Sequence, residues 1–202
     1  MAQLYLLLGG EKKSDMKKIM LISAIAATIL SGSCKKAKEL ANISVDIPYT
    51  QQASIPEVDG YTPGVPIPGG VTVPLPAVPI ATNSKQYVEQ YHTSTNKIVK
   101  VSLKTLTIRT VAPAGQTFDF VDNIELFISA PGLPEKLVAS QYTVPKGQTT
   151  LTLTTAGDVN LKDYFIQDTM YFRESIRINA TPPTGTQLEI KSVFNLVANP
   201  LY

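Results

Sequence analysis

The side chains that most often act as nucleophiles or general bases are scarce in this chain, which has one histidine, His92, and one cysteine, Cys34. His92 follows a predicted helix and stands among polar residues, a setting typical of an exposed histidine at a helix end. A catalytic serine would need a base and a recognisable motif around it, and the sequence has no such motif. We therefore expect a protein that is not an enzyme and that uses no cofactor.

Metal binding finds equally little support in the sequence. Asp119, Asp122 and Glu125 are the carboxylates whose grouping comes nearest to a calcium site, but their spacing matches no calcium-binding loop. We expect them to be solvated loop carboxylates. A zinc site needs three or four Cys, His or carboxylate ligands, and this chain does not supply the usual set.

Sugar binding is a further possibility, because such sites often stack a ring on an exposed aromatic side chain. The chain contains no tryptophan, and packing within strands and helices explains most of its tyrosines. The candidate ligand platforms are Tyr87, Tyr91, Tyr142, Tyr164 and Tyr171. Asp168-Thr169-Met170 resembles the O-glycosylation acceptor of some Gram-negative periplasmic systems and makes Thr169 a candidate site. Asn179-Ala180-Thr181 fits the sequon for eukaryotic N-glycosylation, which predicts a modification only in a eukaryotic chain.

Cys34 stands at the end of a segment with the layout of a secretory signal. Lys17 and Lys18 precede an apolar run, Ile19 to Leu30, and three small residues separate this run from the cysteine. The run is about a dozen residues long, whereas a transmembrane helix needs about 20. An ordinary cleaved signal peptide and a structural helix are the alternatives to a lipoprotein signal.

The segment resembles the signal peptide and lipobox of bacterial lipoproteins, with Ser31 where many lipoboxes have an aliphatic residue. The resemblance implies that Cys34 is acylated and becomes the mature N-terminus, carrying palmitate-type chains that hold the body at the membrane. Cys34 is followed by Lys35 and Lys36, without the Asp that often signals inner-membrane retention and without the acidic cluster that marks surface export. The analogy therefore predicts an outer-membrane lipoprotein that faces the periplasm.

Residues 1–15 do not fit a signal peptide, because its basic region begins at Met16. The residues from Gly9 to Lys13 are all encoded by purine-initial codons and resemble a ribosome-binding site translated as protein. We hypothesise that translation starts at Met16. A long basic region is the alternative.

Charge excludes one class of partner. The chain has 18 basic and 16 acidic side chains, of which four lysines and two acids precede Cys34, so 14 of each remain after cleavage. No basic stripe is left for nucleic acid. With its one cysteine acylated, the fold would have no disulfide and would depend on packing and sheet hydrogen bonds.

Composition divides the chain at two places. We expect a leader over residues 1–33, a lipid-anchored tether over 34–80, and a folded domain over 81–202. The tether is rich in proline from Tyr49 to Ile80, and Gly60 to Gly70 is typical of a linker. Ile43 to Ile47 alternates apolar and polar residues and predicts a first strand, and any strand within Val71 to Ile80 is expected at a sheet edge.

The folded domain has mainly the alternation of β-strands. Thr82 to Tyr91 is the predicted helix, and a helical turn capped by Asp158 is expected further on. The phase of the apolar residues shifts near Lys104 and Thr105, which predicts a bulge. The predicted strands are Ile98–Thr110, Ile124–Ala130, Leu137–Val144, Thr149–Thr154, Met170–Ala180 and Thr186–Val197. Strands at this spacing favour an all-β protein, an antiparallel β-sandwich of the immunoglobulin-like kind with one or two short helices.

Two details of the last strands can be checked against the structure. The turn Pro182-Pro183-Thr184-Gly185 predicts that the final two strands form a hairpin. Glu174 falls on the inward phase between Phe172 and Ile176, so we expect either a position near a sheet edge or a buried partner. The candidate partners are Arg109, Arg173 and Arg177.

Together these features predict a lipid-anchored cell-envelope protein that acts as a structural or accessory module binding another envelope protein. The alternative is a lipoprotein that binds a glycan or a small molecule. A pocket lined with polar groups and exposed tyrosines would favour the alternative. A sealed sandwich with an available edge would favour the interaction module.

Overall fold

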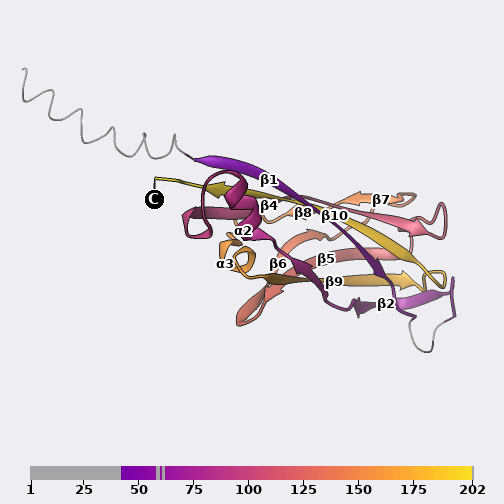
Figure 1. The fold of residues 1–202 in the computed structure, drawn as a ribbon. Coiled ribbons are helices and arrows are strands. Elements are labelled where there is room, and N and C mark those ends of the chain that lie inside the picture. The colour runs from indigo at the N-terminus through magenta and orange to yellow at the C-terminus, as the bar shows by residue number, and fades with distance from the viewer. Residues whose placement is uncertain (1–41, 58–59, 61, 202) are drawn as a thin grey trace, which may run out of the picture. The chain divides into compact units, whose positions relative to one another are not determined.

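The computed structural model describes residues 42–57, 60 and 62–201 (Figure 1). The signal segment, the proposed start at Met16 and Cys34 lie outside the described residues. Within the described part, no helix has both the length and the apolar character needed to cross a membrane. The residues from Ile43 onward form one unit with its own core.

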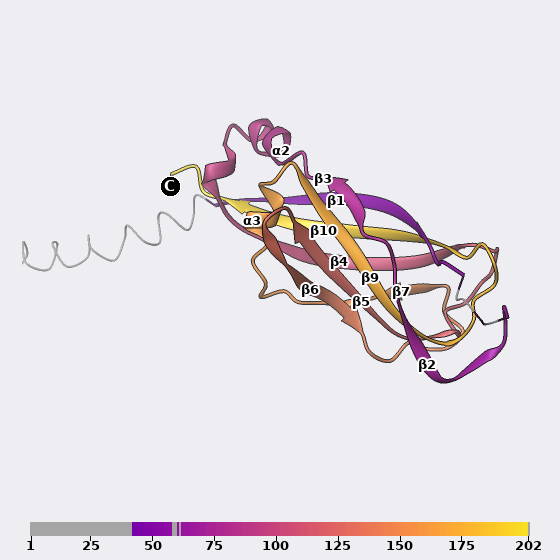
Figure 2. The same cartoon turned by 90° about the horizontal axis from the view of Figure 1, so that it is seen from below.

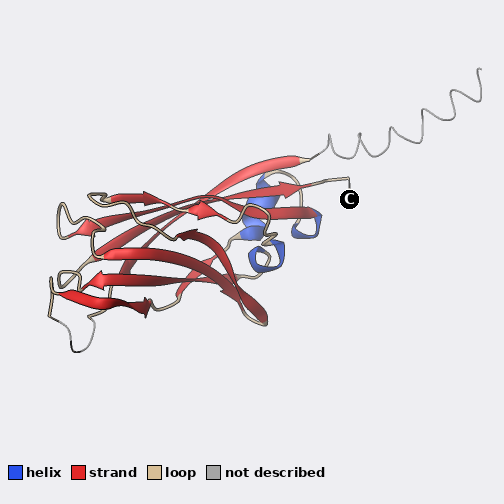
Figure 3. Cartoon of the chain, turned by 180° about the vertical axis from the view of Figure 1, so that it is seen from behind, coloured by secondary structure: helices blue, strands red, loops and turns tan. Residues whose placement is uncertain are grey.

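Strands make up most of the described chain, and the short helices lie together near one end of the strands (Figure 3). The elements in chain order are β1 (Ile43–Ser54), β2 (Pro66–Pro74), β3 (Val78–Ala81), α2 (Ser84–Gln90), the 3₁₀ turn η1 (Thr95–Lys97), β4 (Ile98–Ala112), β5 (Val121–Ala130), β6 (Leu133–Gln141), β7 (Thr150–Thr152), β8 (Thr154–Thr155), α3 (Lys162–Phe165), β9 (Thr169–Ala180) and β10 (Gln187–Ala198).

The strands form two antiparallel sheets that pack face to face (Figures 1 and 2). The four-stranded sheet has the order β1-β10-β4-β7. The six-stranded sheet has the order β2-β9-β5-β6-β8, and β3 also pairs with β9. The predicted antiparallel β-sandwich is confirmed.

One register shift of the four-stranded sheet lies at the position where the apolar pattern of the sequence changes phase. β1 pairs with β10 without a shift from Ile43↔Ala198 to Ser54↔Gln187. Between β10 and β4 the register shifts where Val193 faces Thr105 and Phe194 faces Leu103. Lys104 is the extra residue, so the bulge predicted there is confirmed. The bulge lets both halves of β4 direct apolar side chains inward.

The proline-rich segment expected to be a tether is part of the sandwich, and the expected boundary at residue 81 is wrong. β2 and β3 both pair with β9, and the folded unit begins at Ile43. Ile67, Leu75 and Ile80 are buried in the core. β2 lies at the edge of its sheet, as expected for a strand within Val71 to Ile80, because a missing N–H at an edge does not interrupt a ladder on both sides. The proline content misled only the expected start of the folded domain.

The last two strands do not form the predicted hairpin. β9 belongs to the six-stranded sheet and β10 to the four-stranded sheet, so the turn after Ala180 crosses between the layers. A tight turn has the same sequence signature whether it joins neighbours or crosses over. The predicted strand Thr149–Thr154 also divides, because β7 pairs with β4 and β8 pairs with β6, with buried Leu153 between them.

The predicted helix over residues 82–91 is confirmed as α2, which buries Ser84 and Val88. Its N-cap, Asn83, has a left-handed backbone with φ of 50° and makes no side-chain capping bond. The later helical turn is α3, but Asp158 does not cap it, contrary to expectation. The backbone N–H of Lys162 instead donates to Oδ1 of Asn160 over 3.0 Å.

Four aromatic rings join the two layers within the core. They are Tyr49 of β1, Phe165 of α3, Phe172 of β9 and Phe194 of β10, with neighbouring ring centroids 5.8 to 6.5 Å apart. The Tyr49 hydroxyl donates to the carbonyl oxygen of Thr82 over 2.6 Å. This bond ties the edge of the four-stranded sheet to the chain just after β3.

Candidate functional site

Tyr87 and Tyr91 are the two candidate platform residues that lie close together. Both line a seam between α2 and the paired ends of β1 and β10, together with apolar side chains such as Val45 and Leu196. The seam leaves no room for a water molecule, so it is a packed contact and not a ligand pocket. Tyr91 is 44% exposed at its rim, whereas Tyr87 is half-buried.

The other tyrosines lie elsewhere. Tyr164 is buried, and its hydroxyl donates to the carbonyl oxygen of Pro134 over 2.6 Å, so it is a core residue and cannot act as a platform. Tyr142 is 63% exposed in the turn after β6, near the start of β5. Tyr171 is half-buried on β9 opposite Pro79. The predicted tyrosines therefore do not converge on one site.

A hollow of about 270 Å³ lies beside the turn that joins β9 to β10. Its described lining contains no aromatic side chain and a single carboxylate. The lining residues are Ile55, Pro56, Glu57, Gly60, Pro63, Thr181, Pro182, Pro183, Thr184 and Gly185. The polar side chains of this lining are Glu57, Thr181 and Thr184, and none of the candidate tyrosines is among the described lining residues.

The three candidate calcium ligands are occupied by structural bonds or stand apart. The Asp119 carboxylate accepts the Gly147 N–H over 2.5 Å and the Thr117 hydroxyl over 2.8 Å, and these bonds hold its pKa below the usual range. Asp122 accepts a bond from the Asn179 side-chain amide. No group of three potential ligands within reach of one ion occurs among the described residues. Asp119 thus fixes the loop before β5.

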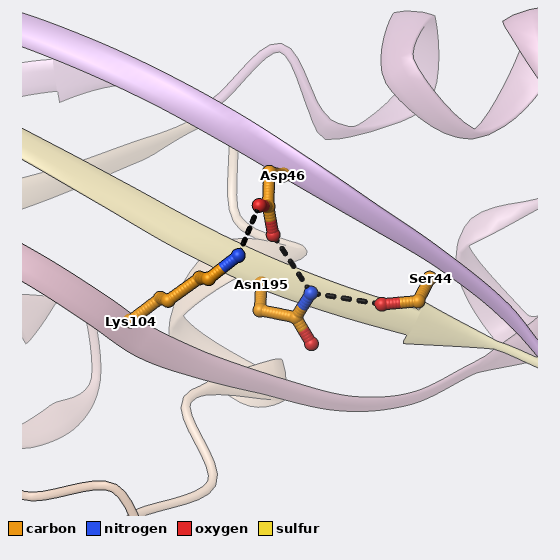
Figure 4. Close-up of polar contacts among 4 residues, drawn as sticks. All are labelled: Ser44, Asp46, Lys104 and Asn195. Atoms are coloured by element: carbon orange, nitrogen blue, oxygen red, sulfur yellow. Dashed lines mark hydrogen bonds and ion pairs between the residues drawn. The ribbon is translucent and has the colours of Figure 1, made fainter.

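Figure 4 shows a polar network on the outer face of the four-stranded sheet. The Asp46 carboxylate pairs with Nζ of Lys104 at 2.5 Å and accepts Nδ2 of Asn195 at 2.9 Å. Asn195 also donates to the Ser44 hydroxyl over 2.8 Å. The bond from Lys104 and then the bond from Asn195 lower the pKa of Asp46. The network connects side chains of β1, β10 and β4 on a solvent-exposed face. We interpret it as a structural contact and not as a ligand site.

Glu174 is the one charged residue buried in the described core, and it lies on the interior strand β9, between β5 and the strands β2 and β3. Neither expectation for it holds, because it is not at an edge and both carboxylate oxygens have no hydrogen-bond partner. The three candidate arginines point elsewhere. Arg173 pairs with Glu135 at 2.6 Å, Arg109 pairs with Glu189 at 3.0 Å, and Arg177 donates to the Gly69 carbonyl.

Burial raises the pKa of Glu174 to about 7. A buried carboxyl without a partner is a functional candidate only where a ligand can reach it. No described cavity is lined by Glu174. Its clearest expected effect is therefore on stability.

The remaining candidates lie on the surface. Thr169 is half-buried at the start of β9 and pairs with Ala81. His92 is exposed after α2 with φ of 52°, and its N–H donates to the Glu89 carbonyl over 3.0 Å. This confirms the expected exposed position at a helix end. Neither residue lies in a cluster that would support catalysis.

The feature that sequence reasoning missed is the length of the free edge of β1. This twelve-residue strand pairs with β10 on one side, and its other side has no strand partner among the described residues. Apart from Pro48, its exposed positions are polar, including Thr50 and Gln52. The alternation at Ile43 to Ile47 indicated a strand, but Pro48 obscured its continuation. Proline within a strand is itself a sign of an edge.

No protein-family model and no curated protein sequence matches the chain. Solved structures resemble it in fold alone. One, from a study of carbohydrate-binding modules of the β-sandwich superfamily, is 13% identical with a TM-score of 0.30. That match covers 75% of this chain, which spans about half (54%) of that structure's length. A chain of Desmodium yellow mottle tymovirus is 12% identical with a TM-score of 0.23, covering 78% of this chain and 89% of the other.

Proposed function

We propose that this protein is a lipid-anchored, non-enzymatic accessory protein of the cell envelope whose β-sandwich binds another protein along the edge strand β1. The observation that carries the proposal is a sealed core together with a long strand, β1, whose outer edge pairs with no other strand among the described residues. The interior is filled by apolar side chains, and no candidate tyrosine lines either of the two described hollows that have room for a ligand. A twelve-residue edge remains available for pairing.

The anchor is supported by the sequence before the folded unit. The lysine pair, the apolar run and the small residues lead directly to Cys34, which is the one cysteine of the chain. The folded unit begins at Ile43, so eight residues separate the lipid-modified position from the first strand. Acyl chains on Cys34 would hold the sandwich at the membrane and raise its local concentration there.

The edge is supported by how β1 is built. Edge strands present unpaired N–H and C=O groups that a partner strand can use, with main-chain bonds giving affinity and alternate side chains giving specificity. β1 has Pro48 and the charged Asp46, both of which discourage pairing with any available strand. Such features fit an edge that is protected from aggregation and still open to a selected partner.

The test is site-specific photo-crosslinking in intact cells, with a C-terminally tagged chain. A photo-crosslinking amino acid replaces Thr50, exposed on β1, or Thr152, exposed on β7 at the opposite edge of the same sheet. We expect the Thr50 position to give one envelope protein at near-equal abundance to the bait. The matched Thr152 position should give none.

Two results would contradict the proposal. Equal capture from both positions would mean that β1 is not the partner surface. Recovery of the tagged protein alone, with each variant present at normal level in the membrane fraction, would exclude a stable protein partner.

A further inference from the structure

One end of the sandwich has an unusual share of exposed apolar side chains. Of the five large apolar residues exposed in the described chain, three lie at the end where α2, η1 and the start of β4 meet the end of β10. They are Tyr91, Val99 and Leu201, which are 44%, 43% and 65% exposed. We call these three residues the proximal face.

Backbone bonds hold this end together. The Asn199 N–H, just after β10, donates to the Lys97 carbonyl of η1 over 2.9 Å, and the Thr93 N–H donates to the Val88 carbonyl of α2 over 3.1 Å. Ile43 pairs with Ala198 and therefore opens β1 at the same end. Both ribbon views show α2, the C-terminal end and the start of β1 together (Figures 1 and 2).

The short connection from Cys34 to the folded unit indicates that this end of the sandwich is the one nearer the membrane. Nine residue steps join Cys34 to Ile43, and an extended chain advances at most about 3.6 Å per residue, which limits the connection to roughly 32 Å. β4 spans 15 residues from this end to the other, or roughly 50 Å at about 3.3 Å per residue. An anchored Cys34 therefore keeps the proximal face near the lipid.

Charge and side-chain type agree with a lipid neighbour. Between Cys34 and Ile43 the sequence has Lys35, Lys36 and Lys38 against one acid, Glu39. A basic segment next to a membrane is attracted to anionic headgroups. Tyrosine at the rim of an apolar surface suits the boundary between headgroups and acyl chains, because its ring is apolar and its hydroxyl remains hydrated.

We infer that the proximal face rests on the lipid surface into which acylated Cys34 is inserted, so that the sandwich stands end-on and directs its far loops away from the membrane. This inference rests on the lipid anchor proposed above. In this orientation β1 runs away from the membrane along its length, and Tyr142 lies at the far end. Tyr142 follows β6, where Gln141 pairs with Ile124 near the start of β5.

The test uses two properties of the sequence: Cys34 is the one cysteine, and the chain contains no tryptophan. The chain from Cys34 to Tyr202 is coupled through Cys34 to a maleimide lipid in phosphatidylcholine–phosphatidylglycerol vesicles, with or without brominated acyl chains. A single fluorescent reporter is introduced as Tyr91→Trp or Leu201→Trp at the proximal face. Tyr142→Trp at the far end is the matched control.

We expect brominated lipid to quench the Tyr91→Trp and Leu201→Trp emission at least twofold and to leave the Tyr142→Trp emission unchanged. No quenching at either proximal position would overturn the inference, and equal quenching at all three positions would show a body lying flat. Coupling through maleimide replaces cellular acylation, so this result is independent of whether the anchor exists. The anchor fails separately if the membrane-purified protein has an unmodified Cys34.

Discussion

The outer face of the four-stranded sheet and the inner face of the six-stranded sheet place acidic side chains in opposite environments. Asp46 lies in solvent, with Lys104 and Asn195 bonded to its carboxylate, and its pKa is lowered (Figure 4). Glu174 lies in the core without a partner, and its pKa is raised. The comparison shows that the phase of the side-chain alternation along a strand determines whether a residue is buried or exposed, even where the residue is acidic and its burial is unfavourable.

The neighbours of Glu174 enforce that phase. Phe172 and Ile176 on the same strand are both buried, and Glu174 pairs with buried Leu126 of β5. A register slip by one residue would rescue the carboxylate but would expose every apolar side chain of β9. Burying one unpaired carboxyl, which can take a proton, costs less than losing that whole face.

The largest expected effect comes from the aromatic cluster where the two sheets meet. Phe194→Ala should lower the free energy of unfolding by about 3–5 kcal/mol, because it leaves a cavity beside Tyr49, Phe165 and Phe172. Urea denaturation measures the change. Val193→Ala, one residue away and only half-buried, is the control. A loss below about 1 kcal/mol would mean that the sheets do not share one core.

The second effect concerns the pH dependence created by Glu174. The pKa of its carboxyl is about 7 in the folded protein, compared with 4.5 for the solvated carboxyl of the unfolded chain. Between these values the folded state binds more protons than the unfolded state, so stability falls as pH rises through this window. The expected loss is about 3 kcal/mol. Urea titrations across the window measure it, and an identical slope in Glu174→Gln would assign it to other groups.

A third prediction removes the buried carboxyl. At about pH 8, Glu174→Leu should raise the free energy of unfolding by about 2 kcal/mol, because an apolar side chain needs no hydrogen-bond partner there. The same substitution at Glu125, a half-buried position on β5, should change it by about 0.5 kcal/mol or less. Destabilisation by Glu174→Leu would indicate a partner for the carboxylate.

The fourth effect tests the tie between the edge of the four-stranded sheet and β3. Tyr49→Phe removes the hydroxyl that bonds the Thr82 carbonyl and should cost about 1 kcal/mol. Thermal unfolding compares it with Tyr142→Phe, which changes an exposed ring and should be neutral. Equal melting temperatures for the two variants would show that the bond adds no stability.

The smallest effect is expected at Asp46. Asp46→Asn keeps the shape of the side chain and removes a solvent-exposed ion pair, which contributes little and is screened by salt. Its melting temperature should stay close to that of the unmodified chain and should converge with it at high salt. A decrease comparable with that of Phe194→Ala would contradict the comparison between the two faces.

Local pattern predicted much of the fold. Alternation located most strands, the phase shift identified the bulge at Lys104, and helix periodicity found α2. Sheet membership was not predictable, because a strand such as β9 has the same inward pattern in either layer. Proline content misled the expected start of the folded domain, because proline is common in linkers and is also tolerated in edge strands such as β2.

The candidate site was less accessible to sequence reasoning. Tyr91 and Tyr142 are exposed as a platform would require, but they are separated by the length of the strands, and Tyr164 is buried. Composition reports which side chains exist, whereas convergence depends on long-range pairing. The free edge of β1 depends likewise on which strands lie beside it.

The measurement that tests the central claim most directly is the intact mass of C-terminally tagged protein purified from membranes. The account predicts a chain that begins at Cys34 and has the added mass of acyl chains, and a Cys34→Ala variant that lacks this mass and leaves the membrane fraction. An unmodified Cys34 in the mature protein, or an N-terminus at another residue, would contradict the account.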